Sequence, residues 1–223
     1  MIELATGYEN LCDHVISPSE SIAELLASRG VTAPITAIPT GVQFDSYYQG
    51  NGSVIRKEMS IPENAFVVGH LGRLAPEKNL KFLSEAVGDF LVNHERAHFL
   101  VIGTGPSSSL MLSYFTNAGL VERVHFTGSV SGDCLINAYH AMDVFAFASK
   151  SETQGMVLTE AMCAGIPVIA LDAPGAREVV RDEVNRRLLM SEDVASYADA
   201  LSWAMNKRKE NLASVKEACL RTV

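Results

Sequence analysis

Two basic side chains stand in a short segment that directly follows an apolar run. Arg73 and Lys78 lie within Gly72–Asn79, between the run Phe66–Leu71 and a segment of helical period. A guanidinium fork and a mobile ammonium can neutralise a diphosphate, whose charge grows on the leaving oxygen when the bond to it breaks. A solvated turn would carry the same residues, so this segment alone leaves both interpretations open.

Two carboxylates flank the start of a later predicted helix. Glu152 precedes that helix and Glu160 lies on it, while the main-chain amides of Gly155, Met156 and Val157 would be first-turn donors aimed at an anion. The alternative is that Glu152 is only a charge at the start of a helix and Glu160 a solvated residue on its surface. Without further context this second interpretation is favoured.

A glycine-rich turn and a histidine complete the candidates. Gly103 and Gly105 lie in Gly103–Pro106, which resembles part of a dinucleotide fingerprint but lacks its third glycine and its acidic residue. A tight strand-to-helix turn is therefore favoured over a nicotinamide site, although glycine also permits the close approach of a ligand. His70 ends the apolar run before Arg73, where a structural role is favoured over a place in a cleft.

These segments follow a regular alternation of elements from residue 66 onward. The predicted strands are Phe66–Leu71, His98–Ile102, Val124–Phe126, Val144–Ala148, Pro167–Leu171 and Leu188–Met190, and the predicted helices include Leu80–Phe90, Leu135–Ala141, Met156–Ala164, Ala176–Arg181 and Val194–Met205. Near-continuous apolar strands separated by helices predict a doubly wound α/β domain with a parallel, Rossmann-like sheet. Ligands of such sheets bind beyond the carboxyl ends of the strands, where the candidate segments lie.

The first sixty residues follow a different plan. A strand over Cys12–Ser17, a helix over Glu20–Ala27 and a strand over Ile35–Ile38 are predicted, followed by a polar, glycine-containing stretch around Tyr48–Ser53. So few elements cannot close a core of their own. They either add to the main sheet or are the tail of another domain.

Composition limits the class of protein. The 223 residues are 48% hydrophobic, which suits one large domain with a piece of another, and the formal charge of -8 argues against nucleic acid as a partner. No Lys or Arg occurs before Arg29, so we expect neither a signal peptide nor a transit peptide, and no apolar run approaches the ~20 residues of a membrane span. The cysteines, which are far apart, favour buried thiols in a reducing cytoplasm: Cys12, Cys134, Cys163 and Cys219.

Taken together, the motifs resemble the nucleotide-sugar domain of glycosyltransferase family 4 (group 1), whose members are retaining enzymes of the GT-B architecture. Glu152 and Glu160 form a Glu-x7-Glu motif followed by Ala-Met-Cys-Ala-Gly-Ile-Pro-Val, and preceded by Gly-Arg-Leu-Ala-Pro-Glu-Lys-Asn and Gly-Thr-Gly-Pro. Asp13–Ser19 and Ile38–Val42 match that family's passage from the acceptor domain into the donor domain. The resemblance thus covers roughly the whole chain.

The resemblance implies a role for each candidate. Arg73 and Lys78 would neutralise the donor diphosphate, and Glu152 would hydrogen-bond the transferred sugar. No metal is implied, because Arg and Lys would supply the positive charge and the chain has no Asp-x-Asp motif. Glu160 would accept hydrogen bonds from the ribose hydroxyls. The first-turn amides of Gly155, Met156 and Val157 would also bind the diphosphate. The loop Gly128–Val130, with Val130, would meet the base through its backbone, and Gly103 and Gly105 would line the nucleotide cleft.

The resemblance also implies a division of the chain and an activity. Residues 1–36 would be the remnant of an N-terminal acceptor domain and hinge, and residues 37–223 the donor-binding domain, the C-terminal half of a GT-B enzyme. The whole enzyme would move a hexosyl group from a nucleoside-diphosphate sugar, with a UDP-sugar the first choice, to a hydroxyl acceptor. The diphosphate would leave from the face that the acceptor attacks. We expect this chain alone to be an inactive fragment, because a second Rossmann-like domain is too large to fit in it.

Thr153-Gln154-Gly155 departs from the family pattern, which usually has an aromatic residue and glycine after the first glutamate. This variant resembles members that act on lipid or polyprenyl-linked acceptors, and so implies an acceptor at a membrane surface, reached through the missing domain. Two alternatives stay open. A non-catalytic nucleotide-sugar-binding module would carry the same donor residues, and a nucleotide-sugar epimerase should show acid/base carboxylates of its own. A nicotinamide dehydrogenase is less favoured than either.

Overall fold

The computed structural model describes residues 7–150, 152–180 and 186–220, and its main feature is a six-stranded parallel sheet. The strand order is β5-β4-β3-β6-β7-β8, and every neighbouring pair is parallel. The strands are β3 (Phe66–Leu71), β4 (Ala97–Ile102), β5 (Val124–Gly128), β6 (Val144–Phe147), β7 (Val168–Leu171) and β8 (Arg186–Leu189).

The direction in which the chain winds reverses at the centre of this sheet. From β3 the chain proceeds outward through β4 to β5, then returns to pair β6 with β3 and proceeds through β7 to β8. Val68 pairs with Val144 and Gly69 with Phe145 across this junction. The prediction of a doubly wound parallel α/β domain is confirmed. Because the loops after β3 and β6 leave in opposite directions, a crevice opens between them at the carboxyl edge.

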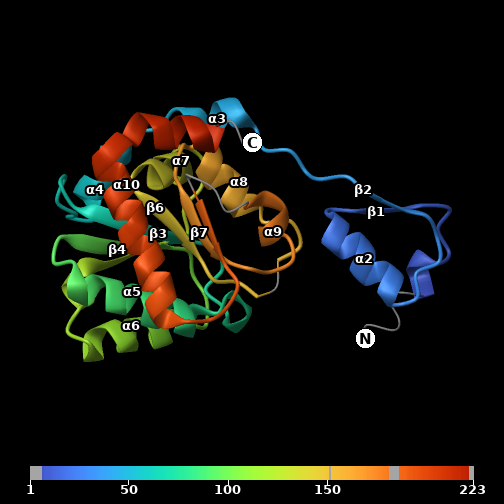
Figure 1. The fold of residues 1–223 in the computed structure, drawn as a ribbon, viewed down its shortest axis with the longest axis horizontal. Coiled ribbons are helices and arrows are strands. Elements are labelled where there is room, and N and C mark those ends of the chain that lie inside the picture. Colours follow the sequence, from blue (N-terminus) through green and yellow to red (C-terminus); the bar gives the residue numbers. More distant parts are fainter. Residues whose placement is uncertain (1–6, 151, 181–185, 221–223) are drawn as a thin grey trace.

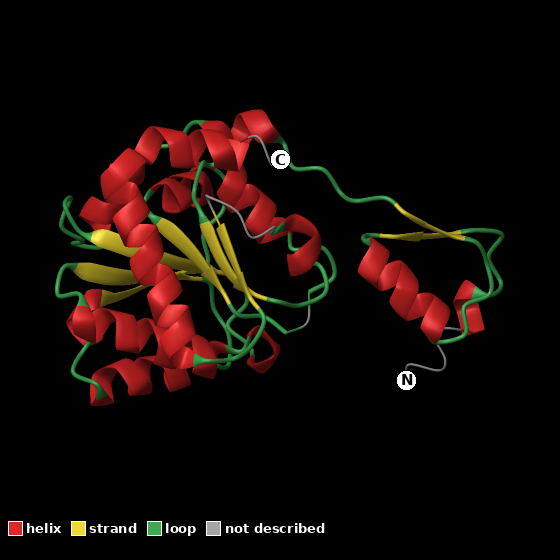
Figure 2. Cartoon of the chain, in the orientation of Figure 1, coloured by secondary structure: helices red, strands yellow, loops and turns green. Residues whose placement is uncertain are grey.

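Helices cover both faces of the sheet and bury two separate cores (Figure 2). Adjacent β3 residues point to opposite faces, so Val68 joins the first core and Val67 the second. The first core is closed by α5 (Leu80–Asn93), α6 (Ser108–Asn117) and α10 (Val194–Leu220). The second is closed mainly by α7 (Asp133–His140) and α8 (Met156–Cys163), with α9 (Ala176–Val179) at its edge.

The amino-terminal elements form a unit of their own, here called the amino-terminal unit (residues 7–38). It contains β1 (Val15–Ser17), α2 (Glu20–Ser28) and β2 (Ile35–Ala37), and among the described residues its two strands pair with each other, in parallel, and with no other strand. Figure 1 shows it beside the large sheet, joined to it by an extended linker. Of the two alternatives left by the sequence, addition of these strands to the main sheet is therefore wrong.

Two short helices follow the linker where the sequence suggested only a polar stretch. They are α3 (Phe44–Tyr48) and α4 (Gly52–Glu58), and the side chain of Asn51 caps α4 by accepting from the amide of Ser53 at 3.2 Å. A side chain at Gly52 would collide with the carbonyl of His140, so this glycine permits close packing against α7. Packing of Ile55, rather than a long helical period, stabilises α4, which explains why the sequence pattern did not reveal it.

Several predicted boundaries and one predicted environment need correction. The first strand begins at Val15 rather than Cys12, α10 continues far beyond Met205, and the predicted end of α9 at Arg181 lies outside the described residues. Cys163 is buried as expected, whereas Cys12 and Cys134 are exposed. The expectation of buried thiols is wrong for these two, because neither lies on an element face that packs on the sheet; the side chain of Cys219 lies outside the described residues.

Within the described ranges no helix is both long enough and apolar enough to cross a membrane. The same residues contain no cluster of three or more His, Cys, Asp or Glu side chains that could hold a metal ion.

Candidate functional site

The loops after β3 and β6 enclose a cavity of about 470 Å³ at the carboxyl edge of the sheet. The loop after β3 contains the short helix η1 (Pro76–Lys78), and the loop after β6 leads into α8. Several of the residues predicted from the sequence line this cavity: Arg73, Lys78, Glu152, Gly155, Met156 and Val157. The reversal of the sheet thus brings together groups that are about eighty positions apart in the chain.

An ion pair spans the cavity between its two loops. Lys78 Nζ lies 3.0 Å from Glu152 Oε2, with side-chain exposures of 18% and 19%. Lys78 stands at the end of η1, where Asn79 adopts a left-handed conformation with φ of 55° and begins α5. The two predicted functional side chains are therefore each other's partners in this structure, and both remain within reach of the cavity.

Arg73 lies at the mouth of the same cavity. Its side chain is 70% exposed and pairs with Glu77, the fourth residue after it in the chain. An exposed pair of this kind contributes little to stability. The guanidinium is therefore free to exchange its carboxylate partner for another anion.

The first turn of α8 forms the opposite wall. Gly155 caps the helix with φ of 71°, and a side chain there would come within 3.0 Å of the Gly175 carbonyl. The amides of Met156 and Val157 lie in the first turn, where no preceding helical carbonyl can accept from them. Together with the helix dipole they make this wall attractive to an anion.

Glu160 lies one turn further along α8, outside the lining of this cavity. Its Oε2 accepts a hydrogen bond of 2.6 Å from the phenol of Tyr139, which is buried on α7. Burial, reinforced by the charge of Glu160, raises the pKa of Tyr139 well above its ordinary range, and burial with the same charge raises the pKa of Tyr47 to about 12. Sequence reasoning missed both tyrosines, because Tyr139 reads as an ordinary aromatic residue of a predicted helix and Tyr47 precedes a stretch for which no element was predicted.

The structure places the other predicted candidates away from the cavity wall. Side chains at Gly103 and Gly105 would collide with the carbonyls of Gly72 and Leu74, so these glycines let the turn after β4 pack against the loop after β3. The amide of Leu74 donates to the Thr104 carbonyl at 2.9 Å across this contact. Val130 is half-buried and packs on the second core. The favoured interpretation of Gly103–Pro106 as a tight turn agrees with this packing.

His70 does not line the cavity either. It is 1% exposed, and its Nδ1 lies 3.1 Å from the carbonyl oxygen of Ala146 on the neighbouring strand. Burial lowers its pKa to about 4, so the imidazole is neutral at pH 7. The favoured structural role of His70 agrees with this position.

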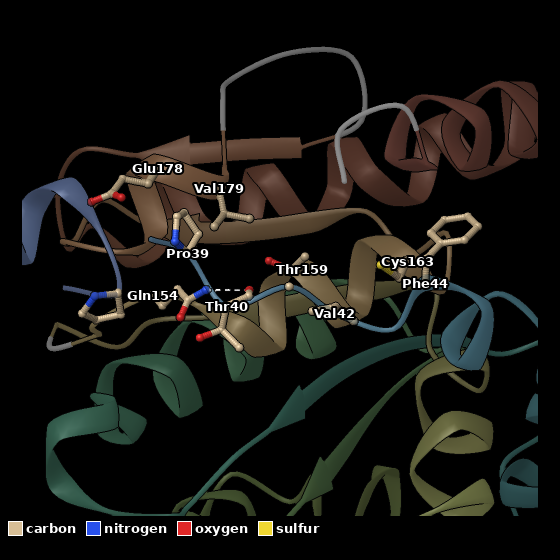
Figure 3. A pocket seen from close by; sticks show the side chains of 11 residues that line it. Pro39, Thr40, Val42, Phe44, Gln154, Thr159, Cys163, Glu178 and Val179 are labelled. Atoms are coloured by element: carbon tan, nitrogen blue, oxygen red, sulfur yellow. Dashed lines mark hydrogen bonds between the residues drawn. The ribbon is translucent and has the colours of Figure 1, made fainter. Parts of the chain in front are cut away.

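A second cavity of about 450 Å³ lies between the linker and the helices α8 and α9 (Figure 3). Gln154 reaches across it, and its side-chain amide donates to the Thr40 carbonyl at 2.7 Å. Gln154 also lines the first cavity, and so joins the loop after β6 to the linker.

The amino-terminal unit is attached to the same region through polar contacts. The Ser19 hydroxyl donates to the Thr153 carbonyl at 2.6 Å, and Glu178 of α9 accepts from the amides of Glu20 and Ser21 at 3.2 and 2.8 Å. Glu178 thus caps the start of α2 from another part of the chain. We name these contacts the polar latch; nothing in the sequence pattern indicated them.

The chain matches a known family of enzymes. Residues 53–219 match the family model of the group 1 glycosyl transferases. The chain therefore belongs to the group 1 glycosyltransferases, which confirms the family predicted from its motifs.

Curated relatives agree with this assignment. The chain is 30% identical to the alpha-monoglucosyldiacylglycerol synthase of Streptococcus pneumoniae over 81% of this chain and 42% of that protein. It is 28% identical to the GDP-mannose-dependent alpha-mannosyltransferase of Mycobacterium tuberculosis over 94% of this chain and 53% of that protein. The chain thus spans about half or less of the length of these relatives.

Solved structures show the same fold. Anabaena Alr3699/HepE, crystallised with UDP and glucose, matches with a TM-score of 0.87 and 24% identity over 99% of this chain and 62% of that one. The pneumococcal O-GlcNAc transferase GtfA, crystallised with UDP and GlcNAc, matches with a TM-score of 0.75 and 23% identity over 94% of this chain and 41% of that one. These neighbours are GT-B glycosyltransferases, as the sequence predicted for the fold.

Proposed function

We propose that this chain is the donor-binding part of a retaining glycosyltransferase, which moves a hexosyl group from a nucleoside-diphosphate sugar to a hydroxyl acceptor. The observation that carries the proposal is the cavity at the reversal of the sheet, where Lys78 and Glu152 form an ion pair opposite the first turn of α8. The loop after β3 thus offers cations, and the loop after β6 offers a carboxylate and the main-chain amides of the α8 first turn. A diphosphate bearing a sugar matches this combination.

The ion pair between Lys78 and Glu152 gives the site a way to exchange partners. When the diphosphate enters, Lys78 binds it, and Arg73 at the mouth gives up Glu77 for the same anion. Glu152 is then free to accept hydrogen bonds from the hydroxyls of the transferred sugar. The cations neutralise the charge that develops on the departing phosphate oxygen, so the chain's own side chains supply this electrostatic stabilisation.

The proposed transfer exchanges one bond at the sugar for another on the same face. The bond from the anomeric carbon to the diphosphate oxygen breaks, and a bond to the acceptor oxygen forms from the face that the diphosphate leaves. The acceptor hydroxyl proton passes to the departing phosphate oxygen. A front-face reaction retains the anomeric configuration, and the "alpha" in the names of the two curated relatives supports this stereochemistry.

Nucleotide binding tests the donor site directly. Calorimetry with UDP should give saturable binding, and GDP should be titrated in parallel because one relative is named as GDP-mannose-dependent. Lys78→Ala should weaken binding about tenfold or more, because a charge-assisted contact is worth about 1.5–3 kcal/mol. Arg73→Ala, at the exposed mouth, should have a smaller effect.

Lys81→Ala is the matched control for these variants. Lys81 is a lysine of the neighbouring helix α5, 78% exposed and paired only loosely with Glu85 at 4.0 Å. Its removal should leave nucleotide affinity unchanged. Absence of UDP and GDP binding at millimolar concentration, or affinity that is equal in wild type, Lys78→Ala and Arg73→Ala, would remove the proposed site.

The acceptor site is proposed to lie in a further domain, so the isolated chain should bind nucleotide without transferring sugar. The name of the pneumococcal relative, a glucosyldiacylglycerol synthase, supports a lipid acceptor at a membrane surface. Incubation with a nucleotide sugar and a panel of diacylglycerol and soluble hydroxyl acceptors tests this dependence. Formation of a glycosylated product by the chain alone would contradict it.

A further inference from the structure

The phenol of Tyr139 lies at the junction of the elements that surround the proposed donor site. Its hydroxyl donates to Glu160 Oε2 at 2.6 Å and lies 3.4 Å from the Val157 carbonyl oxygen. Val157 belongs to the first turn of α8, and Glu160 follows it by three residues on the same face of the helix. A single hydroxyl of α7 therefore contacts both the anion-binding turn and the carboxylate behind it.

We propose that Tyr139 is a positioning residue, which holds the Glu160 carboxylate in place to accept hydrogen bonds from the ribose hydroxyls of the nucleotide. This inference rests on the proposed function. It adds that discrimination between ribose and deoxyribose depends on a phenol that does not itself touch the ligand.

The geometry orients the carboxylate for this role. Glu160 Oε2 accepts a hydrogen bond from the Tyr139 phenol, and the Tyr47 phenol also hydrogen-bonds the Glu160 side chain. An ionised carboxylate has about four acceptor positions, so lone pairs remain for the ribose hydroxyls. A glutamate side chain has several rotatable bonds, and its rotamers are costly to immobilise when a ligand binds. The hydrogen bond to a buried partner removes part of this cost in advance.

Tyr139 is itself well held. It is fully buried in the second core, and its ring lies 6.0 Å from that of Phe145 and 5.8 Å from that of Tyr47, measured between centroids. Its raised pKa keeps the hydroxyl protonated at neutral pH, so it acts only as a donor toward the carboxylate. A rigid donor of this kind fixes the direction in which the Glu160 carboxylate faces.

Tyr47 closes the other side of the same cluster. It comes from α3, the first helix after the linker, and its ring meets that of Tyr139 edge to face, with an interplanar angle of 73°. α3 packs against α8. The carboxylate is therefore contacted by tyrosines of two helices, of which α3 is the less buried.

The test compares nucleotides that differ only in the 2′-hydroxyl. The full chain is titrated with UDP and 2′-deoxy-UDP, and with GDP and 2′-deoxy-GDP, and the ratio of the two dissociation constants is recorded for each base that binds. Wild type should prefer the ribonucleotide. Tyr139→Phe should reduce that preference toward one, with a loss of about tenfold in ribonucleotide affinity, the size expected for a hydrogen bond to a charged group.

The ratio separates positioning from a merely structural role. A variant that only loosens the domain weakens both nucleotides equally and leaves the ratio unchanged. Glu160→Ala should abolish the preference, and adding Tyr139→Phe to Glu160→Ala should not change the ratio further. Tyr47→Phe, at a half-buried position, offers a milder second variant and should reduce the ratio in the same direction by less.

Tyr114→Phe is the matched control, because Tyr114 is a half-buried tyrosine that packs on the first core, on the opposite face of the sheet. It should leave the ratio at the wild-type value. Tyr139→Phe with a wild-type ratio would overturn the inference while the proposed function stands. Failure of wild type to bind any of the four nucleotides would overturn the proposed function and this inference together.

Discussion

The two parallel sheets of this chain are built from the same kind of unit and differ in how they are covered. In the large sheet β3 is covered on both faces, and Val67 and Val68 are fully buried. In the amino-terminal unit β1 and β2 are also parallel and joined by a helix, but Ile16, at the centre of β1, is 67% exposed. Parallel strands are normally covered on both faces. The large sheet meets this requirement within the described chain, whereas the small sheet does not.

The contact between the two regions differs in kind from the contacts within the large domain. Neither core cluster contains a residue that precedes Tyr47 in the described chain. The amino-terminal unit is held instead by the polar latch, and the linker that follows it is held by Gln154, which donates to Thr40. Hydrogen bonds at a partly exposed surface exchange readily with water. The large domain should therefore keep its stability when the amino-terminal unit detaches.

The largest loss of stability is expected from a buried ion pair of the large domain. Asp143 pairs with Arg56 at 2.9 Å, with side-chain exposures of 7% and 9%, and also accepts from the Val67 amide at 2.7 Å. Asp143→Ala would leave a buried guanidinium and a buried amide without this partner, at a cost of about 3–5 kcal/mol. Urea unfolding should show the loss.

Arg177→Ala is the control for this variant, because Arg177 is 52% exposed where it pairs with Asp172. Its removal should cost less than about 1 kcal/mol. A loss for Asp143→Ala that is no larger than the loss for Arg177→Ala would contradict the assigned importance of the buried pair.

Acid should destabilise the large domain through His70. Burial lowers the pKa of His70 to about 4, so between this value and the ordinary pKa the unfolded chain binds a proton that the folded chain does not. The cost of keeping this imidazole neutral in the folded chain is therefore negligible well above pH 6.5. It grows as the pH falls toward 4 and lowers the free energy of unfolding by about 2 kcal/mol at pH 5.

This pH dependence is measured by unfolding wild type and His70→Gln in urea at pH 7.5 and pH 5. The variant should be less stable at pH 7.5, but its stability should fall less on acidification. An identical fall in both proteins would show that other groups cause the acid sensitivity.

Loss of a contact of the polar latch should reduce stability by less, and the loss should be confined to α2. Glu178→Ala removes the acceptor for the amides of Glu20 and Ser21 and should cost α2 about 1 kcal/mol, the size of a lost helix cap. Hydrogen exchange should become faster at the start of α2, while urea unfolding of the large domain stays unchanged.

Glu24→Ala, on the exposed surface of α2, should leave both measurements unchanged. Global destabilisation by Glu178→Ala would mean that the two regions share more than the latch, and the contrast between them would fail.

The smallest effect is expected on the uncovered face of the small sheet. Ile16→Thr keeps a β-branched residue and removes apolar surface that already faces water, so stability should change by less than about 0.5 kcal/mol. Val67→Thr makes the equivalent change at a fully buried position and should cost several times more. Equal losses in urea unfolding would indicate that the face of Ile16 is covered in solution.

The sequence predicted the large domain well because its signals are local. Apolar runs such as Phe66–Leu71 and Val144–Ala148 are characteristic of strands buried on both faces, and the helices between them repeat with a clear period. The short helices α3 and α4 carry no such period. They are stabilised by packing, α3 against α8 and α4 against α7, which a local sequence pattern does not reveal. The contact between Ser19 and Thr153 spans 134 positions, a distance over which no local pattern operates.

The candidate site divides in the same way. Arg73, Lys78, Glu152 and the first turn of α8 follow strands directly, so their place at the carboxyl edge of the sheet could be inferred from the chain alone. The pairing of Lys78 with Glu152 needed the strand order, because only the neighbouring positions of β3 and β6 bring these loops together. The placement of Glu160 against Tyr139 depended on how α7 and α8 pack.

By itself the sequence determined the fold class, the family, and the loops that carry charged side chains at the sheet edge. These follow from apolar periodicity and from motifs whose residues are close together in the chain. The tertiary structure decided which of these side chains share one cavity and which glycines serve packing, and it revealed the phenol that holds Glu160 and the latch that holds the amino-terminal unit. Each of these depends on contacts between distant segments, whose geometry exists only once the sheet and its helices have packed.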